Sequence, residues 1–109
     1  MNDVLSPLEV PFARVNAVAR DSPAQDAGLL EEDLIFKFGN LNAENHNHLK
    51  AIAALVPDVA GKQGSISIYV KRRKPHAAPD YWDTVVLSLK PRPWSGRGLI
   101  GCHIVPYTN

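Results

Sequence analysis

One stretch of this chain repeats its apolar residues at helical spacing, and three others alternate apolar with polar residues. The alternating stretches are residues 33–38, 65–70 and 84–89. Such alternation is typical of a strand with one buried face. The helical stretch, residues 42–56, places Leu49, Ile52, Ala53 and Val56 on one stripe, as an amphipathic helix does. Separate strands with this little helix favour an α+β domain built on an antiparallel sheet or an open barrel.

Two shorter elements precede this helix. Residues 12–18 alternate loosely and predict a strand. A single helical turn should follow, because Ser22 is a good N-cap, Pro23 suits the first helical position and Gln25 completes a capping box. Gly28 can adopt the left-handed conformation that ends a helix. Local sequence therefore specifies both ends of this turn.

Prolines and glycines predict where other elements end. Gly39 and Asn40 indicate a turn after the second strand, and Pro57 is expected to end the longer helix. Residues 71–80 are polar and contain prolines, so they predict a long hairpin connection. Pro106 has no N–H and is expected to end the last strand.

The C-terminal part of the chain carries a binding signal. Gly98 and Gly101 bracket Leu99 and Ile100, and an apolar, strand-like run from Cys102 to Val105 follows directly. Glycine has no Cβ, so backbone N–H groups in such a loop can point into open space and form an anion-binding concavity. A strand that begins beside the loop offers an edge where a peptide can add on. Loop and strand together predict a receptor for a peptide that ends in a carboxylate.

Composition bounds the class of protein. The 109 residues, 45% of them hydrophobic, suit one compact domain, which we expect over residues 12–107 after a flexible leader of residues 1–11. The net charge of +1 gives no general attraction for nucleic acid. The apolar runs are too short to span a membrane, and the N-terminus lacks the basic region of a secretory signal. The single cysteine, Cys102, cannot form an internal disulfide and mildly favours a reducing compartment.

Three other chemistries have weak support. His46 and His48 are two residues apart, so on a helix they do not face each other, and no metal-ligand cluster lies nearby in the sequence. Cys102 and His103 would point to opposite faces of a strand, so the histidine is badly placed as a base for a thiol nucleophile. The basic run Lys71 to Lys74 lacks interleaved aromatic residues for stacking nucleic acid. We therefore expect no metal, no cofactor and no enzymatic activity.

The element order and two motifs resemble a PDZ domain. The segment Asp21 to Leu29 contains the Ser-Pro-Ala and Ala-Gly-Leu steps of the small PDZ helix, and a strand led by Asp33 follows. Residues 45–56 resemble the long helix that walls the PDZ peptide groove, and the segment Leu99 to Gly101 looks like the loop that binds the peptide carboxylate. That loop comes first in the commonest PDZ order and last here. The resemblance implies a circularly permuted PDZ-like domain: a mainly antiparallel open barrel of five to six strands with two helices.

A closer resemblance lies within that superfamily. The segment Pro93 to Ile104, together with Phe12 to Val15, resembles the PDZ part of the 26S proteasome non-ATPase regulatory subunit 9 family, whose members are chaperones of proteasome base assembly. The likeness extends over most of the chain, from Phe12 to Val105. It implies a non-catalytic monomer of the cytoplasm and nucleus. The partner it implies is the C-terminal tail of a proteasomal AAA-ATPase subunit.

The resemblance also assigns site residues. The peptide carboxylate is expected to be bound by Gly98, Leu99, Ile100, Gly101 and Cys102. The groove is expected to be lined by His103, Ile104, His48, Leu49, Ile52 and Leu55, with a solvated helix histidine as the alternative for His48. Arg97 could steer the carboxylate, with a plain surface charge as the alternative. Two other functions stay open: a PDZ module of a protease-associated or other regulatory protein that reads a different C-terminal tail, and a nucleic-acid binder that uses the basic run.

Overall fold

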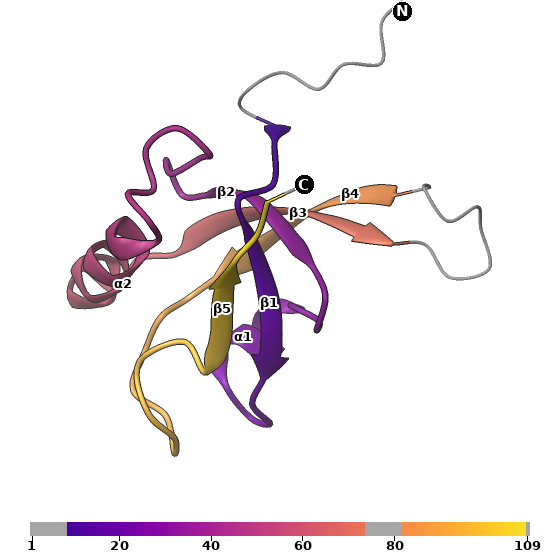
Figure 1. Cartoon of the computed structure of the whole chain (residues 1–109). Helices are drawn as coiled ribbons and strands as arrows, with labels where there is room; N and C mark the ends of the chain where they lie inside the picture. The colour runs from indigo at the N-terminus through magenta and orange to yellow at the C-terminus, as the bar shows by residue number, and fades with distance from the viewer. Residues whose placement is uncertain (1–8, 74–81, 109) are drawn as a thin grey trace, which may run out of the picture.

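The computed structural model describes residues 9–73 and 82–108. They form an α+β fold with an antiparallel sheet and two helices, as the sequence predicts (Figure 1). The elements are, in chain order, β1 (Ala13–Val18), α1 (Pro23–Ala27), β2 (Leu34–Phe38), α2 (Lys50–Gly61), β3 (Ile66–Arg73), β4 (Trp82–Leu89) and β5 (Cys102–Pro106). Most of the expected leader and residues 74–80 of the expected hairpin connection lie outside the described residues.

The five strands form one open sheet in the order β4-β3-β2-β1-β5. Every neighbouring pair is antiparallel. The last strand of the chain, β5, therefore lies beside the first, β1, and forms one edge of the sheet (Figure 1). An edge strand leaves half of its backbone N–H and C=O groups without a partner strand. Within the described residues, β5 is thus available to pair with another chain.

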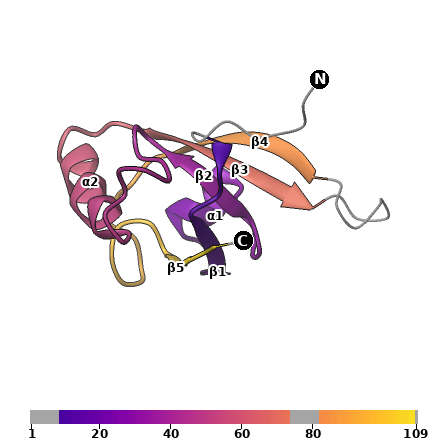
Figure 2. The same ribbon diagram turned by 45° about the horizontal axis from the view of Figure 1, so that its top comes forward.

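The core packs one face of the sheet against both helices. Its members include Val15, Ile35, Phe38, Ile68, Val70 and Leu89 from the strands, Ala24 from α1, and Ile52 and Val56 from α2. Figure 2 shows α2 set at one end of the sheet rather than across its middle. The predicted inner face of the third strand is confirmed, since Ile66, Ile68 and Val70 are all buried.

β2 departs from its predicted pattern because both of its faces are buried. Ile35 and Phe38 belong to the core cluster, whereas Phe36 is buried outside it. A bulge that follows Ile35 breaks the alternation. Phe36 packs edge-on against Tyr69, with ring centroids 5.8 Å apart, and Lys71 Nζ lies 4.9 Å from its ring centroid. The strand is therefore covered on both sides, by the core and by side chains of β3.

β1 also contains a bulge, at Asn16. Alternation from Val15 predicts Ala17 on the buried face, but Ala17 is exposed because the bulge shifts the register. Asn16 is then opposite no single residue of β5, and its side-chain Nδ2 lies 3.1 Å from His103 Nδ1.

α2 begins later than the apolar stripe predicts, at Lys50 rather than near residue 42. The three residues before it have left-handed backbone: φ is 52° at Asn47, 55° at His48 and 68° at Leu49. A right-handed helix cannot continue through such residues. Upstream, Asn45 Oδ1 accepts the Asn42 N–H at 2.7 Å. Side-chain bonds of this kind compete with helical ones, and local periodicity does not reveal them.

Pro57 lies inside α2 instead of ending it, which corrects the predicted C-terminus. Proline has no N–H, so the carbonyl of Ala53 lacks its helical donor. Both residues are exposed, and water can bond that carbonyl instead. The helix continues to Gly61. Ala53 was predicted on the buried stripe, but only Ile52 and Val56 of the helix are buried.

α1 has the capped ends that its sequence predicts. Ser22 Oγ accepts the Gln25 N–H at 3.1 Å and donates to Ala19 O at 2.8 Å. Gly28 ends the helix with a φ of 96°. Ser22 is fully buried, so this cap also anchors the turn to the domain.

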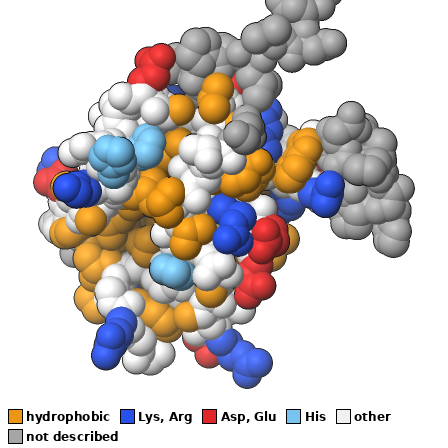
Figure 3. All heavy atoms as spheres, in the orientation of Figure 1, with side chains coloured by type: hydrophobic (Ala, Val, Ile, Leu, Met, Phe, Trp, Pro, Cys, Tyr) orange, Lys and Arg blue, Asp and Glu red, His pale blue; other side chains and the backbone are white. Residues whose placement is uncertain are grey.

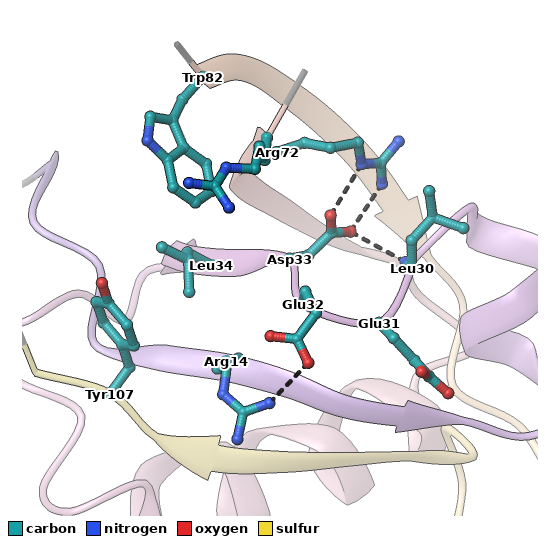
Figure 4. A pocket seen from close by; sticks show the side chains of 10 residues that line it. Arg14, Leu30, Glu31, Glu32, Asp33, Leu34, Arg72, Trp82 and Tyr107 are labelled. Atoms are coloured by element: carbon teal, nitrogen blue, oxygen red, sulfur yellow. Dashed lines mark hydrogen bonds and ion pairs between the residues drawn. The ribbon is translucent and has the colours of Figure 1, made fainter. Parts of the chain in front are cut away.

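A buried ion pair joins the end of α1 to β2 and β3, since β3 runs on through Arg73 rather than ending at residue 70. Arg72 donates two bonds to the carboxylate of Asp33, Nε to Oδ1 at 2.8 Å and Nη2 to Oδ2 at 2.7 Å (Figure 4). Arg72 Nη2 also donates to Gly28 O at 2.9 Å, and the Leu30 N–H donates to Asp33 Oδ2 at 3.0 Å. The hydrogen bonds with Asp33 raise the pKa of Arg72. The middle of the basic run thus holds the fold together.

We predict that Asp33→Asn destabilises the domain by on the order of 3 kcal/mol, because it removes one partner of a buried ion pair. Denaturant unfolding of both proteins measures the loss. Asp58→Asn is the matched control, since Asp58 pairs with Lys62 on the surface of α2 and such pairs contribute about 0–1 kcal/mol. Equal losses in the two variants would contradict a structural role for the Asp33 pair.

Candidate functional site

The glycine loop lies at the same end of the molecule as α2. Figures 1 and 2 both show the segment between β4 and β5 passing this end before it enters β5. Hydrophobic side chains gather on the surface between them (Figure 3). Partly buried hydrophobic residues of the two regions pack against the core: Leu49, Ala51, Leu55 and Val59 in and beside α2, and Leu99 and Ile100 in the loop. The edge strand therefore adjoins an apolar surface.

The loop is held by its carbonyl groups. Backbone N–H groups from three other parts of the chain bond them: Arg92 to Leu99 O at 3.0 Å, Ala24 to Ile100 O at 2.8 Å and Ala19 to Gly101 O at 2.8 Å. Within the described residues, the N–H groups of Leu99, Ile100 and Gly101 donate no backbone bond. Three successive N–H groups are thus left for a ligand. Successive unpaired N–H groups form a concavity that suits an anion.

Two glycines of the loop adopt backbone that other residues rarely adopt. Gly98 has a φ of 70° and Gly101 a φ of 75°. At Gly101 a side chain would also lack room, since a Cβ would lie 2.2 Å from Ser22 Cβ and 2.8 Å from Trp94 Cζ2. A Cβ at Gly98 would meet nothing within 4 Å. Gly101 is therefore required by both backbone conformation and packing, and Gly98 by conformation alone.

β5 directs alternate backbone groups to the free edge. Two bonds fix the side that faces β1: Tyr107 N–H to Phe12 O at 3.1 Å, and Ala19 N–H to Gly101 O at 2.8 Å. Neighbouring residues of a strand direct their N–H and C=O groups to opposite sides. Those of Cys102 and Ile104 therefore point to the free edge. β5 includes Pro106, one residue beyond the predicted run to Val105, and a bond to β1 follows it at the Tyr107 N–H.

An open hollow of about 590 Å³ adjoins the loop. Residues 17–19, Trp94 and residues 97–103 line it. The loop residues predicted to bind a carboxylate are therefore brought together in one wall. Arg97 is exposed and supplies a positive charge there, the one formal charge in the described lining. Such a charge favours an anionic ligand.

The predicted residues of the long helix do not line this hollow. Ile52 is buried in the core, 7% exposed. Leu55 is partly buried and leans over Gly39, where a Cβ would lie 3.0 Å from its Cδ2. His48 is exposed and precedes the helix, and Leu49 occupies the N-cap position. Leu49 and Leu55 thus belong to the apolar surface described above, and Ile52 belongs to the core.

Among the residues described, two chemistries raised by the sequence find no support: a reactive Cys102 thiol and a group of metal ligands. Burial raises the pKa of the Cys102 thiol to about 12, so the thiol is neutral near pH 7. Cys102 packs against the core, whereas the next side chain, His103, is exposed. In the described ranges, no three His, Cys, Asp or Glu side chains are grouped to hold a metal ion. The groups on offer are backbone donors, an apolar surface and one cation.

A second hollow, of about 420 Å³, is lined by residues of β1 to β4, of the turn before β2, and by Tyr107 (Figure 4). Most of its charged side chains are engaged with one another or with an aromatic ring, and Glu31 is exposed. Arg14 pairs with Glu32 at 3.1 Å, Arg72 pairs with Asp33, and Arg73 lies over Trp82, 5.5 Å from the ring centroid. This hollow serves the fold, and the candidate site is the glycine loop with the β5 edge.

Relatives of this chain share one name. The 26S proteasome non-ATPase regulatory subunit 9 of Homo sapiens is 36% identical over 95 residues, which is 87% of this chain and 38% of the relative. The probable subunit 9 of Caenorhabditis elegans is 32% identical over 88% of this chain and 44% of its own length. The probable 26S proteasome regulatory subunit p27 of Schizosaccharomyces pombe is 29% identical over 95% of this chain and 47% of its own length. The chain belongs to the 26S proteasome non-ATPase regulatory subunit 9 family.

The family assignment rests on these relatives, because no family model matches the chain. The chain spans less than half the length of the curated subunit 9 and p27 proteins that it resembles. No helix in the described ranges is long and apolar enough to cross a membrane.

The sequence alone did not identify the residues that support the glycine loop of this chain. Trp94 Nε1 donates to Arg97 O at 3.2 Å, and its ring lies against Gly96 and Gly101. Ser22 packs against Gly101 from the other side. The capped turn, which the sequence describes only as a local element, therefore forms part of the loop's support. The only signal in the sequence was the strength of that cap.

We predict that Gly101→Ala destabilises the chain by about 2–5 kcal/mol, because it combines left-handed strain with a clash against Ser22 and Trp94. Gly98→Ala introduces the strain without the clash and should cost about 1–2 kcal/mol. Gly61→Ala, with open space and no positive φ, should cost nothing. Thermal and denaturant unfolding rank the three variants. A Gly101→Ala protein as stable as Gly98→Ala would contradict the packing described.

We predict slow alkylation of Cys102 in the native chain. Its raised pKa leaves little thiolate below about pH 9, and reactivity should rise only as the pH approaches 12. At pH 8, iodoacetamide should react on the order of a hundredfold faster with the urea-unfolded chain than with the native one. Mass spectrometry of timed samples measures both rates. Equal rates would mean that the thiol is not buried.

Proposed function

We propose that this chain is a non-catalytic, PDZ-like peptide-binding domain with a circularly permuted element order. In this proposal it binds the C-terminal tail of a proteasomal AAA-ATPase subunit and acts as part of a chaperone for assembly of the proteasome regulatory particle base. The domain would act as a monomer, in the cytoplasm and the nucleus. The subunit 9 and p27 names of its relatives support the proteasomal setting.

One observation carries the proposal: within the described part of the chain, residues 99–101 have bonded carbonyls and N–H groups that donate no backbone bond. A loop with no ligand to bind would gain from pairing those donors, since unpaired donors cost free energy when they are shielded from water. A carboxylate accepts several N–H bonds at once, and charge-assisted bonds are stronger than neutral ones. The exposed Arg97 adds attraction for the same group.

The free edge of β5 sets the direction of the ligand. A tail lying antiparallel to β5 would exchange backbone bonds with Ile104. It would end beside Cys102, the first residue of β5, which directly follows the loop. Its terminal carboxylate would then meet the N–H groups of Leu99, Ile100, Gly101 or Cys102. Its last side chain would pack on the apolar surface beside the loop, and burying one such side chain contributes roughly 1.5–3 kcal/mol.

The position of β5 in the sheet supports the permuted order. The loop and β5 come last in the chain, yet β5 lies beside β1. Moving the loop and its strand from the start to the end of a chain leaves such a pairing intact, because the termini of compact domains often lie close together.

The test is a titration with C-terminal peptides of the proteasomal ATPase subunits, each with a free and an amidated terminus. At least one free-acid tail should bind with a Kd on the order of micromolar, after the cost of ordering a flexible peptide. Its amide should bind at least about tenfold more weakly, since it loses charge-assisted bonds. Amide shifts in NMR spectra should fall on residues 99–104 and on α2.

The Arg97→Gln and Asp58→Asn variants provide matched controls, because both replace an exposed charge but only the first lies at the loop. Arg97→Gln should weaken the free-acid tail and leave the amide unchanged. Equal binding of acid and amide would contradict carboxylate capture. Binding of unrelated free-acid tails alone would favour a PDZ module of another regulatory system.

A further inference from the structure

Three polar side chains of β1 and β5, together with Glu32 from the turn before β2, form a chain of hydrogen bonds that the carboxylate site does not use. Arg14 Nη1 donates to Glu32 Oε2 at 3.1 Å and to Asn16 Oδ1 at 3.3 Å. Asn16 Nδ2 lies 3.1 Å from His103 Nδ1. The β1 bulge makes this contact possible, since it turns Asn16 toward β5. The chain ends at His103, which is exposed.

The order of donors fixes the proton on the imidazole. Arginine has only donors, so the atom of Asn16 that faces it must be the carbonyl oxygen Oδ1. The amide nitrogen of Asn16 then faces His103 and donates to Nδ1, which must carry no proton. In the neutral ring the proton is therefore on Nε2. Arg14 and Asn16 act as positioning residues that leave His103 with an N–H donor directed away from them.

The register of a bound tail brings one ligand side chain to this donor, and this step rests on the proposed function. An antiparallel strand that exchanges bonds with Ile104 and ends beside Cys102 has its penultimate residue opposite His103. Residues opposite each other in neighbouring strands project to the same face, with Cβ atoms about 4.5–5.5 Å apart. The last and antepenultimate side chains point to the other face, toward the core side and α2.

We infer that His103 selects tails whose penultimate residue carries a hydrogen-bond acceptor, and that a carboxylate (Asp or Glu) suits it best. A basic penultimate side chain is disfavoured, because it has only hydrogen-bond donors and the His103 Nε2–H is itself a donor. The ring cannot adapt by moving its proton to Nδ1, since Asn16 Nδ2 donates there. The other two charged groups in this chain of bonds, Glu32 and Arg14, are paired with each other.

The test uses fluorescein-labelled peptides of sequence Gly-Ser-Gly-Ala-Val-X-Leu with a free C-terminus, where X is Glu, Gln, Ala or Lys. Anisotropy titrations on the 109-residue chain should rank Glu first and Lys last. The Kd for Glu should be about three- to tenfold lower than that for Ala, as expected for one exposed hydrogen bond. The amidated Glu peptide reports carboxylate capture separately.

Two variants isolate the roles. His103→Phe keeps a ring but removes the donor, so the ratio of the Kd values for the Ala and Glu peptides should fall to about one. Asn16→Ala removes the fixed proton position, and ¹⁵N shifts of the imidazole should then report a mixture of tautomers in place of Nε2–H alone. The Glu preference should fall in parallel.

Each outcome decides the matter. A Glu preference lost in His103→Phe supports the inference. Carboxylate-dependent binding with equal Kd values for all four peptides, or a ranking unchanged in His103→Phe, overturns the inference and leaves the proposed function standing. Equal binding of free-acid and amidated peptides, or no binding at all, overturns both.

Discussion

The site depends on an imbalance in how residues 99–101 are bonded. Their carbonyl groups accept N–H groups from the segment after β4, from α1 and from the end of β1, while their own N–H groups donate no backbone bond in the described chain. The loop is thereby fixed on one side and available on the other. A preorganised set of donors binds an anion without a further cost of ordering the loop.

α1 is central to that arrangement although it has only five residues. Its Ser22 caps the helix and fills the space beside Gly101, and Ala24 donates to Ile100 O. The Asp33 to Arg72 pair then ties the end of α1 to β2 and β3 through Gly28 O. A short element far from the loop in sequence thus connects the loop to the sheet.

Features set by helix caps and by alternation were predictable, and features set by bulges, local side-chain bonds and exposure were not. The Ser22 cap, the Gly28 end and the buried face of β3 follow from local chemistry and alternation, and all are confirmed. The bulge at Asn16, the left-handed residues before Lys50 and the continuation of α2 through Pro57 were missed. Each of these depends on a bond or an exposure that periodicity does not encode.

The candidate site divides in the same way. Gly98 and Gly101 were identifiable from the sequence, because glycine, which has no side chain, readily adopts a positive φ. The partners of the loop carbonyls were not, since they are contributed by segments up to about eighty residues away in the chain. The long helix shows the same limit: its stripe was found, but Ile52 belongs to the core rather than to the hollow beside the loop.

Amide hydrogen exchange along β5 tests the central claim most directly. In the free chain, the N–H groups of Cys102 and Ile104 should exchange fast and those of His103 and Val105 slowly, because the latter two face β1. Addition of a free-acid tail peptide should slow Cys102 and Ile104 selectively. Protection of Ile104 in the free chain, or no change on addition of a peptide that binds, would contradict strand addition at this edge.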